Sequence, residues 1–184
     1  VAASVLQVVS GALRGVRLLP DGRRHVASFL LPGDFFGFSD AETYSHAVEA
    51  ISDVKLLRFP RRSFDDLLET DAGARRCFFS LVCGELSAVQ EHMLLLSRKT
   101  ALERIATFLL HLSDRKMIQS PVEASRVILP MSRADIGDYL GLTIETVSRT
   151  LSELRRRKII QLVRANLVQF RDRRTLEMIA AGKA

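Results

Sequence analysis

The chain has 184 residues, of which 47% are hydrophobic, and this is enough for one large or two small folded domains. Aromatic residues make up only 7% and tryptophan is absent, so we do not expect a broad stacking surface for single-stranded nucleic acid. No apolar run approaches the ~18–20 residues of a membrane span and no secretory signal follows Val1. We therefore expect a cytoplasmic protein with no membrane partner.

Charge is distributed unevenly along the chain, whose net charge is +6. Residues 1–96 hold 10 basic and 12 acidic residues, whereas residues 97–184 hold 17 basic and 9 acidic residues. A nearly neutral first half and a basic second half predict a sensor or scaffold joined to a module that binds a polyanion.

Short apolar runs separated by turn residues occupy the first sixty residues. The runs Val5–Val9, Val26–Leu31 and Val54–Phe59 have the length and composition of strands. Pro20-Asp21-Gly22 and Pro32-Gly33-Asp34 between them favour tight turns. Several short strands at this spacing predict a barrel or jelly roll.

This β domain is expected to span residues 1–71. Strand-like sequence begins at Val5 and the first residue is not methionine, so we expect the N-terminal part of the domain to be missing. A short helix capped by Ser63 and running through Leu68 is predicted to follow the strands.

Residues 72–97 predict one long helix that mediates dimerisation. Its apolar residues recur at spacings of 3, 4, 3, 4 and 3, as in the a/d seam of a two-stranded parallel coiled coil. The predicted dimer interface consists of Phe79, Val82, Leu86, Val89, Met93 and Leu96. A second apolar set is expected to pack on the β domain and consists of Phe78, Leu81, Leu94 and Leu95. The alternative is one wide apolar face buried inside a monomer.

The two cysteines, Cys77 and Cys83, are six residues apart in this predicted helix. That spacing places them on different faces, so neither a disulfide nor a shared metal site is expected. We interpret them as buried or half-buried thiols, with a redox switch as the alternative.

The C-terminal domain, residues 98–184, begins with an amphipathic helix over Arg98–Arg115 and contains a predicted helix-turn-helix. Ser132 is a good N-cap, with Asp135 at the capping-box position. The first helix is expected to direct Ala134, Ile136 and Leu140 inward and to end at Gly141.

Thr143 is expected to cap a second helix that continues to about Lys158. Val147, Leu151 and Leu154 form its apolar stripe, while Glu145, Ser148, Arg149 and Ser152 form a polar stripe on the opposite face. A recognition helix in the major groove needs both stripes. Arg149 can donate two hydrogen bonds to guanine and Glu145 can accept one from cytosine, although Glu and Arg four apart are usually only a salt bridge.

Basic residues and a hairpin follow this second helix. Arg155-Arg156-Arg157-Lys158 is expected to extend toward phosphate, with Arg156 as the clearest contact. The apolar runs Ile160–Val163 and Leu167–Phe170, joined by Arg164-Ala165-Asn166, predict a β-hairpin wing. The fold class is therefore α+β: a truncated β-roll, a long dimerisation helix and a winged helix-turn-helix.

Across its whole length the chain resembles the CRP/FNR superfamily of bacterial transcription regulators. Three stretches carry the resemblance: Pro32 to Gly37, Met93 to Ala106 and Ser132 to Arg149. The order Glu145-x-x-Ser148-Arg149 is similar to the FNR and FixK branch.

The resemblance implies a homodimeric regulator, with activation expected, that reads a double-stranded inverted repeat with TTGA-like half-sites. The implied base-reading residues are Ile144, Glu145, Ser148 and Arg149, and the implied phosphate contacts are Arg133, Thr143 and Thr146. It also implies contact with RNA polymerase through Ser39 and Asp40, and a low-oxygen, nitrogen-oxide or nitrogen-fixation response.

No effector-binding site is expected in this sequence. Residues 38–45 contain no arginine for a cyclic-nucleotide phosphate, and Asp40 and Glu42 would repel one. Two cysteines assemble no iron–sulfur site, so we expect no metal and no cofactor. A regulator gated by a small molecule or by haem is the alternative, with four histidines as weak candidate ligands.

The sequence also bears on two other functional classes, enzymes and nonspecific DNA-binding proteins. The sequence contains no glycine-rich phosphate loop, metal-ligand cluster or nucleophile elbow, so an enzyme is not expected. A nonspecific architectural DNA-binding protein is the remote alternative, because such a protein needs a basic surface but no base-reading stripe.

Overall fold

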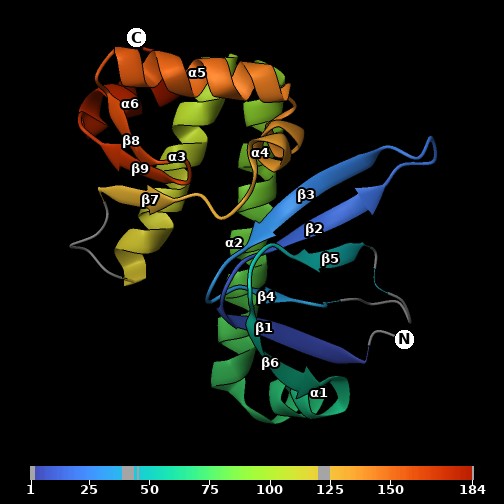
Figure 1. The fold of residues 1–184 in the computed structure, drawn as a ribbon. Helices are drawn as coiled ribbons and strands as arrows, with labels where there is room; N and C mark the ends of the chain where they lie inside the picture. Colours follow the sequence, from blue (N-terminus) through green and yellow to red (C-terminus); the bar gives the residue numbers. More distant parts are fainter. Residues whose placement is uncertain (1–2, 39–43, 45, 120–124, 184) are drawn as a thin grey trace. The chain divides into compact units, whose positions relative to one another are not determined.

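The computed structural model describes residues 3–38, 44, 46–119 and 125–183. The chain divides into two compact units, residues 1–91 and residues 92–184 (Figure 1). Helix α2 (Ala72–Arg98) contributes its first five turns to the first unit and its last residues to the second. Among the described residues, no helix is both long and apolar enough to cross a bilayer.

Two three-stranded antiparallel sheets are formed by the described residues of the first unit. One sheet has the order β4-β1-β6 and the other the order β3-β2-β5. Their strands are β1 (Ser4–Ser10), β2 (Leu13–Leu18), β3 (Arg24–Leu30), β4 (Phe35–Phe36), β5 (Ala47–Ala50) and β6 (Lys55–Pro60). The predicted turn at Asp21-Gly22 joins β2 to β3, and Gly22 has the positive φ, 82°, that such a turn requires.

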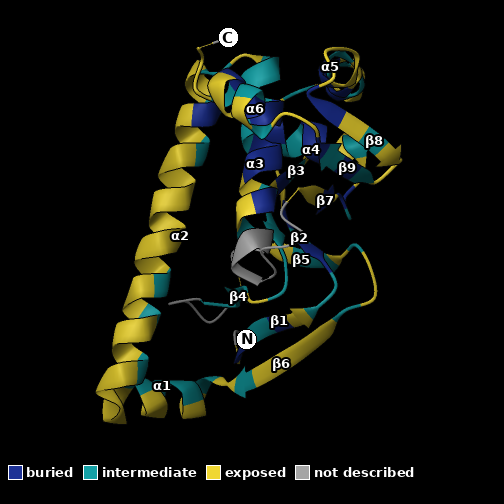
Figure 2. Cartoon of the chain, turned by 90° about the vertical axis from the view of Figure 1, so that its left-hand side faces the viewer, coloured by how far each residue is buried: buried dark blue, intermediate teal, exposed yellow. Residues whose placement is uncertain are grey.

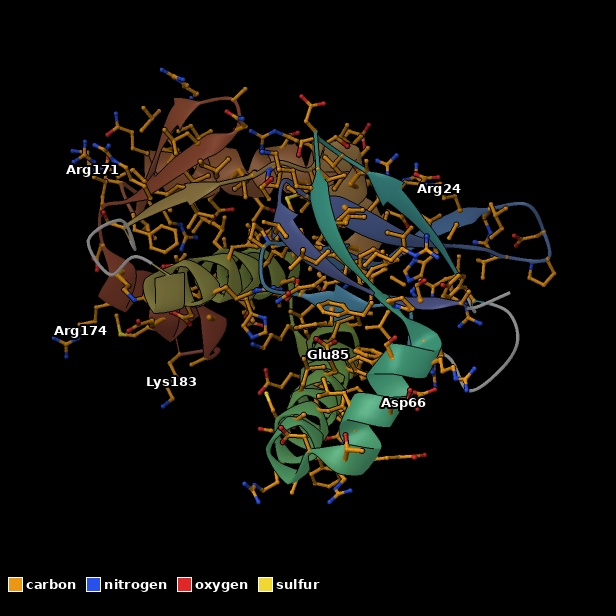
Figure 3. The ribbon with its side chains drawn as sticks, turned by 90° about the horizontal axis from the view of Figure 1, so that it is seen from below. Arg24, Asp66, Glu85, Arg171, Arg174 and Lys183 are labelled. Atoms are coloured by element: carbon orange, nitrogen blue, oxygen red, sulfur yellow. The ribbon has the colours of Figure 1, made fainter. Side chains whose placement is uncertain are left out.

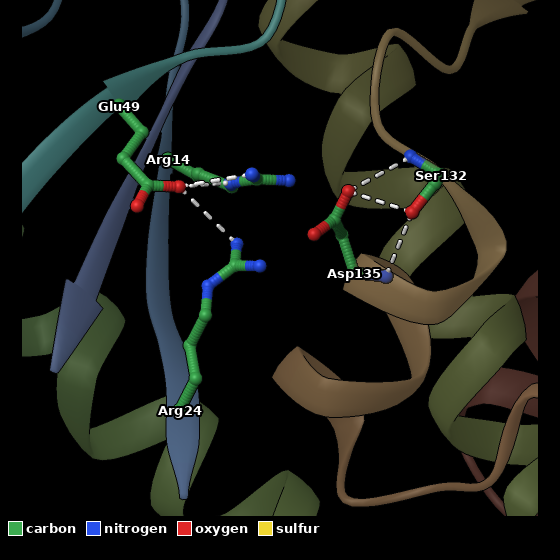
Figure 4. A network of polar contacts seen from close by, with 5 residues as sticks. All are labelled: Arg14, Arg24, Glu49, Ser132 and Asp135. Atoms are coloured by element: carbon green, nitrogen blue, oxygen red, sulfur yellow. Dashed lines mark hydrogen bonds and ion pairs between the residues drawn. The ribbon is translucent and has the colours of Figure 1, made fainter. Parts of the chain in front are cut away.

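The sheets are held by apolar side chains inside and by charged pairs at the surface. Val5 and Val8 on β1 are almost fully buried, as are Val16 on β2 and Val26 on β3. Across the second sheet, the Glu49 carboxylate forms ion pairs with two arginines, Arg14 at 2.9 Å and Arg24 at 3.4 Å (Figure 4).

Helix α1 (Arg61–Thr70) begins earlier than predicted, so the expected cap at Ser63 is wrong. Pro60 ends β6 and leads directly into the helix without any side-chain cap. The N–H of Arg61, which a cap would otherwise satisfy, donates to the Ala3 carbonyl at 3.0 Å. A backbone carbonyl just before β1, distant in the sequence, thus replaces the local capping residue.

The apolar residues of α2 outside the predicted seam divide into two groups. Phe78 packs as predicted on the β domain: its ring lies 5.1 Å from Phe38 and 5.5 Å from Phe64, in edge-on geometry. Leu94 is 61% exposed, so its expected packing is wrong, whereas Leu95 is buried in the second unit. Cys77 and Cys83 are both exposed, which contradicts the expectation of buried thiols.

In its described residues, the second unit contains four further helices and a small sheet. Helix α3 (Ala101–Gln119) packs against α5 (Ile144–Arg156), α6 (Arg173–Ala180) and β7 (Arg126–Ile128). Helix α4 (Arg133–Leu140) precedes α5, and the sheet has the order β7-β9-β8, with β8 at Ile160–Arg164 and β9 at Leu167–Phe170. Figure 2 shows buried residues gathered in α3, α4 and α5, while most of α2 is exposed.

Two features of this unit differ from the sequence-based expectation. Helix α3 begins at Ala101, because Thr100 and Glu103 form a reciprocal capping box (2.8 and 3.4 Å) that separates it from α2. Helix α6 was not predicted; the Asp172 carboxylate caps it by accepting the N–H of Thr175 at 2.9 Å.

Candidate nucleic-acid interface

The turn between α4 and α5 depends on two glycines. Gly141 ends α4 in the left-handed conformation, with φ 63° and ψ 40°, as the sequence predicted. Gly137, which the sequence analysis did not single out, lies against the turn: a Cβ there would be 2.6 Å from the Leu142 carbonyl oxygen. Only glycine permits this close approach, so both positions fix the angle at which α5 leaves the turn.

Both helices of the motif begin at the predicted caps. The Ser132 hydroxyl accepts the N–H of Asp135 at 3.1 Å, and the Asp135 carboxylate accepts the Ser132 N–H at 3.1 Å and its hydroxyl at 2.7 Å (Figure 4). The Thr143 hydroxyl accepts the N–H of Thr146 at 3.2 Å. Ala134 is exposed rather than inward, because the core-facing side of this short helix is formed by Ile136 and Leu140.

Helix α5 has one face in the core and one in solvent. Val147, Leu151 and Leu154 are at most 1% exposed, as predicted for the apolar stripe. The predicted base-reading residues lie outside this buried stripe: Ile144, Glu145 and Arg149 are exposed and Ser148 is half-buried. The structure therefore brings these four residues together on one accessible surface at the start of α5.

The first turn of α5 holds an ionised carboxylate and a row of side-chain hydrogen bonds. The backbone N–H of Glu145 itself and the Thr143 hydroxyl hold the pKa of the Glu145 carboxyl below its ordinary value, so the group is ionised at neutral pH. The Arg149 guanidinium donates to the Thr146 hydroxyl at 3.3 Å, and that oxygen lies 3.1 Å from the Thr143 hydroxyl. Two predicted phosphate contacts and one predicted base contact thus form a single hydrogen-bonded row.

Basic side chains surround this surface. Arg156 is exposed in the last turn of α5, and Arg133 is half-buried at the start of α4. Arg157 is paired with Glu153 on the same helix, so it is the least available residue of the predicted basic run. Lys158, the second residue after α5, has a positive φ of 60°, and the N–H of Ile159 donates to the Leu154 carbonyl at 3.0 Å.

The predicted wing is present as the β8–β9 hairpin, and Arg164-Ala165-Asn166 at its turn is exposed. Arg171, just after β9, donates to Gln161 on β8. Figure 3 shows Arg171, Arg174 and Lys183 extending outward from their backbones. The second unit therefore presents cations beyond α5 itself.

Comparison with known proteins gives two family matches and several relatives that align with most of this chain. Residues 1–71 match the family described as "Cyclic nucleotide-binding domain" and residues 103–179 the family described as "Crp-like helix-turn-helix domain". The chain is 43% identical to the nitrogen fixation regulation protein FixK of Azorhizobium caulinodans, over 97% of this chain and 72% of that protein. The chain belongs to the CRP/FNR family, in its FixK-like branch.

Further relatives and a solved structure agree with this assignment. The transcriptional activatory protein AadR of Rhodopseudomonas palustris is 40% identical over 99% of this chain and 75% of that protein. The solved structure of FixK2 from Bradyrhizobium japonicum is 44% identical, with a TM-score of 0.87, and covers 97% of this chain and 87% of that chain. The first unit of this FixK-like chain is thus a β-roll and the second carries a Crp-like helix-turn-helix.

The predicted seam of this FixK-like protein is apolar and uncovered within the chain. Phe79 is 69% exposed and Leu86 is 59% exposed. Val82, Val89 and Met93 are exposed as well, whereas Leu96 is half-buried. A row of large apolar side chains on one helix is an unusual surface for a monomer.

Two predicted sites lie outside the described residues. Ser39 and Asp40, assigned to polymerase contact, are among them, as are most of the positions from which loss of a cyclic-nucleotide phosphate site was inferred. Both therefore remain predictions from the sequence. Within the part of the chain that the structure describes, no group of three or more metal-binding side chains occurs.

Proposed function

We propose that this chain is a homodimeric activator of transcription of the FixK type, which binds a double-stranded inverted repeat with TTGA-like half-sites. The observation that carries the proposal is the surface at the start of α5, where Glu145, Ser148 and Arg149 are accessible above a fully buried stripe. This is the arrangement that lets a helix enter the major groove without disturbing its own core.

Each residue of that surface has a chemistry suited to one base edge. Arg149 donates two hydrogen bonds to O6 and N7 of guanine, and the ionised Glu145 accepts from N4 of cytosine. Ile144, 47% exposed, offers an apolar contact for a thymine methyl group. Ser148 is small enough to let the helix approach the bases closely.

Phosphate contacts position this reading surface on the duplex. Arg133 at the start of α4 and Arg156 at the end of α5 supply positive charge at the two ends of the motif. Thr143 and Thr146 supply hydroxyl groups at the N-terminus of α5, where the helix dipole also favours an anion. These contacts give affinity for any sequence and set the register of the reading residues.

The exposed seam on α2 supports dimerisation. A second copy that placed the same residues against Phe79, Leu86 and Met93 would remove them from water. A two-fold dimer presents two recognition helices, which is why the operator is an inverted repeat. Each half-site alone binds too weakly to give specific occupancy.

Regulation is proposed from the sequence and from the names of the relatives. The protein is neither an enzyme nor a cyclic-nucleotide receptor. It acts in the cytoplasm in a low-oxygen, nitrogen-oxide or nitrogen-fixation response, and it contacts RNA polymerase through Ser39 and Asp40. The relatives named FixK and AadR support the regulatory class and the activating direction. Contact with polymerase rests on the resemblance alone.

Base reading is tested by Arg149→Ala beside its matched control Arg156→Ala, each titrated against operator and scrambled duplex at two salt concentrations. Arg149→Ala removes a bidentate contact from each half-site, worth roughly 1–3 kcal/mol apiece, so a dimer loses about 2–6 kcal/mol of specific binding. Most of the affinity of this variant for scrambled duplex should remain. Arg156→Ala weakens all sequences about equally and makes the salt dependence shallower.

Wild-type binding measured with and without cyclic AMP completes the experiment, and no change is expected. Retained operator preference in Arg149→Ala would show that α5 is not the reader. Equal wild-type affinity for operator and scrambled duplex would instead favour a nonspecific architectural protein. A cyclic AMP requirement would favour the ligand-gated alternative.

A further inference from the structure

One arginine joins the ends of two helices in the second unit. Arg104, in the first turn of α3, donates from Nε to the Lys99 carbonyl at 2.8 Å and from Nη2 to the Leu96 carbonyl at 2.9 Å. Its third nitrogen, Nη1, donates to the Leu140 carbonyl at 2.9 Å and to that of Gly141 at 3.5 Å. Two nitrogens thus serve the end of α2, and one serves the end of α4.

These carbonyls lie at helix C-termini, where a nearby cation is favourable. The last carbonyls of a helix have no partner within the helix, and the helix dipole makes that end negative. Leu96 lies in the last turn of α2 and Leu140 is the last residue of α4, so both meet this description. The planar, permanently charged guanidinium fork can satisfy both ends at once in one fixed geometry.

Other contacts join the same two helices. The ring of His92 on α2 stacks on the ring of Tyr139 on α4, with centroids 4.2 Å apart and an interplanar angle of 21°. A Cβ at Gly141 would lie 3.6 Å from a Leu96 methyl and 3.3 Å from Nη1 of Arg104. The last turns of α2 are therefore packed on the helix-turn-helix as one body, in the unit that begins at His92.

Met93 and Leu96 belong both to this body and to the predicted seam. If two copies meet along the seam, the position of each recognition helix relative to the dimer axis depends on how α4 is attached to the end of α2. That attachment sets the distance between the two recognition helices. The distance must match half-sites spaced by about one helical turn of DNA, or ~10–10.5 base pairs.

We infer that Arg104 is a positioning residue that sets the half-site spacing the dimer accepts, by fixing α4 to the last turn of the dimerisation helix. It touches no base and no phosphate. This inference rests on the proposed function, because it requires a dimer that reads two half-sites.

The test is a spacing series on the full chain. Wild-type protein, Arg104→Gln and Arg104→Lys are titrated against operators with the optimal spacing and with one or two base pairs inserted or removed. The wild type discriminates steeply between spacings. In Arg104→Gln we expect this discrimination to fall about tenfold. Arg104→Lys, which keeps the charge but lacks the fork, gives an intermediate value.

Arg173→Gln is the matched control, because Arg173 also makes several hydrogen bonds inside this unit. It donates to Ser113 at 2.8 Å and to Glu177 at 2.8 Å and pairs with Asp114, joining α6 to α3 rather than α2 to α4. We expect it to lower the melting temperature while the spacing preference stays that of the wild type. A merely structural role for Arg104 would give this same result.

The possible results distinguish failure of this inference from failure of the proposed function. Wild-type spacing discrimination in Arg104→Gln would overturn the inference while leaving the proposed function intact. If that variant fails to fold, the lysine variant decides: an intermediate discrimination supports the inference, and a wild-type value overturns it. A wild-type protein that prefers no operator over scrambled duplex would remove the proposed function, and the inference with it.

Discussion

Helices α2 and α5 both carry apolar residues at alternating spacings of three and four, but the chain covers only one of the two stripes. On α5 the stripe is buried, with Val147 and Leu154 at 0% exposure. On α2 the stripe from Phe79 to Met93 faces solvent. Periodicity therefore reveals that a helix has an apolar face, but not which surface covers that face. The stripe that the chain leaves uncovered supports the proposed contact with a second copy.

Among tests of this difference between the α2 and α5 stripes, Leu86→Glu is expected to have the largest effect. Two glutamates would face each other in the apolar seam, at a cost of ~3–5 kcal/mol for each buried unpaired charge and roughly 6–10 kcal/mol per dimer. We expect a folded monomer that has lost operator binding. Sedimentation measures the assembly, and Ala88→Glu, at an exposed position beside the seam, is the control that stays dimeric. An intact Leu86→Glu dimer would remove the coiled-coil assignment.

A second substitution examines the covered stripe. Leu151→Ala removes a side chain that is 1% exposed and should destabilise the second unit by ~2–5 kcal/mol. Because the partner surface lies within the same chain, the loss should not depend on protein concentration. Thermal unfolding at two concentrations measures this. A concentration-dependent loss would mean that α5 is covered by another copy, and the contrast with α2 would disappear.

A smaller effect comes from the cap of α5. Thr143→Ala leaves the N–H of Thr146 without its acceptor and should cost about 1 kcal/mol. Thr143→Ser keeps the hydroxyl and is expected to restore most of the stability. Equal melting temperatures for the alanine variant and the wild type would mean that packing alone holds this turn.

The smallest expected effect is a difference in pH dependence between the N-terminal caps of α2 and α5. The Asp71 carboxylate caps α2, accepting N–H groups of Gly73 at 2.6 Å and Ala74 at 2.9 Å, and these bonds hold its pKa below the ordinary value of 3.8. Since the folded pKa is depressed, the stabilisation is present above 3.8 and is lost as pH falls through the folded pKa. The difference in melting temperature between wild type and Asp71→Asn should vanish over that window. The Thr143→Ala difference should fall only in part there, because the Thr143 hydroxyl loses its bond to the Glu145 carboxylate but still accepts the N–H of Thr146.

Local signals in the sequence predicted much of the candidate site. Ser132, Gly141 and Thr143 each act through atoms within three or four residues, so their roles as caps and stop follow from spacing alone. The buried stripe of α5 also follows from spacing. The capping box of Thr100 and Glu103 carries an equally local signature, and attention to it would have placed the break between α2 and α3 correctly.

Other features depend on groups far away in the sequence. Arg104 reaches the Leu140 carbonyl 36 residues later, and no local pattern announces that contact. Gly137 is required by the path of the turn that follows it, and the start of α1 by a backbone contact with Ala3. The exposure of Ala134 and Leu94 shows the same limit: apolar character alone does not tell which side of a helix the rest of the fold will cover.

The hydrogen bond from Arg149 to Thr146 has a consequence for the entropy of binding. A free arginine side chain carries about 2 kcal/mol of rotamer entropy, part of which is lost when it is fixed against a base. Because Arg149 is already restrained 3.3 Å from the Thr146 hydroxyl, some of that freedom has been given up before any duplex arrives. In the proposed complex, this restraint would lower the entropy cost of fixing Arg149 against a base.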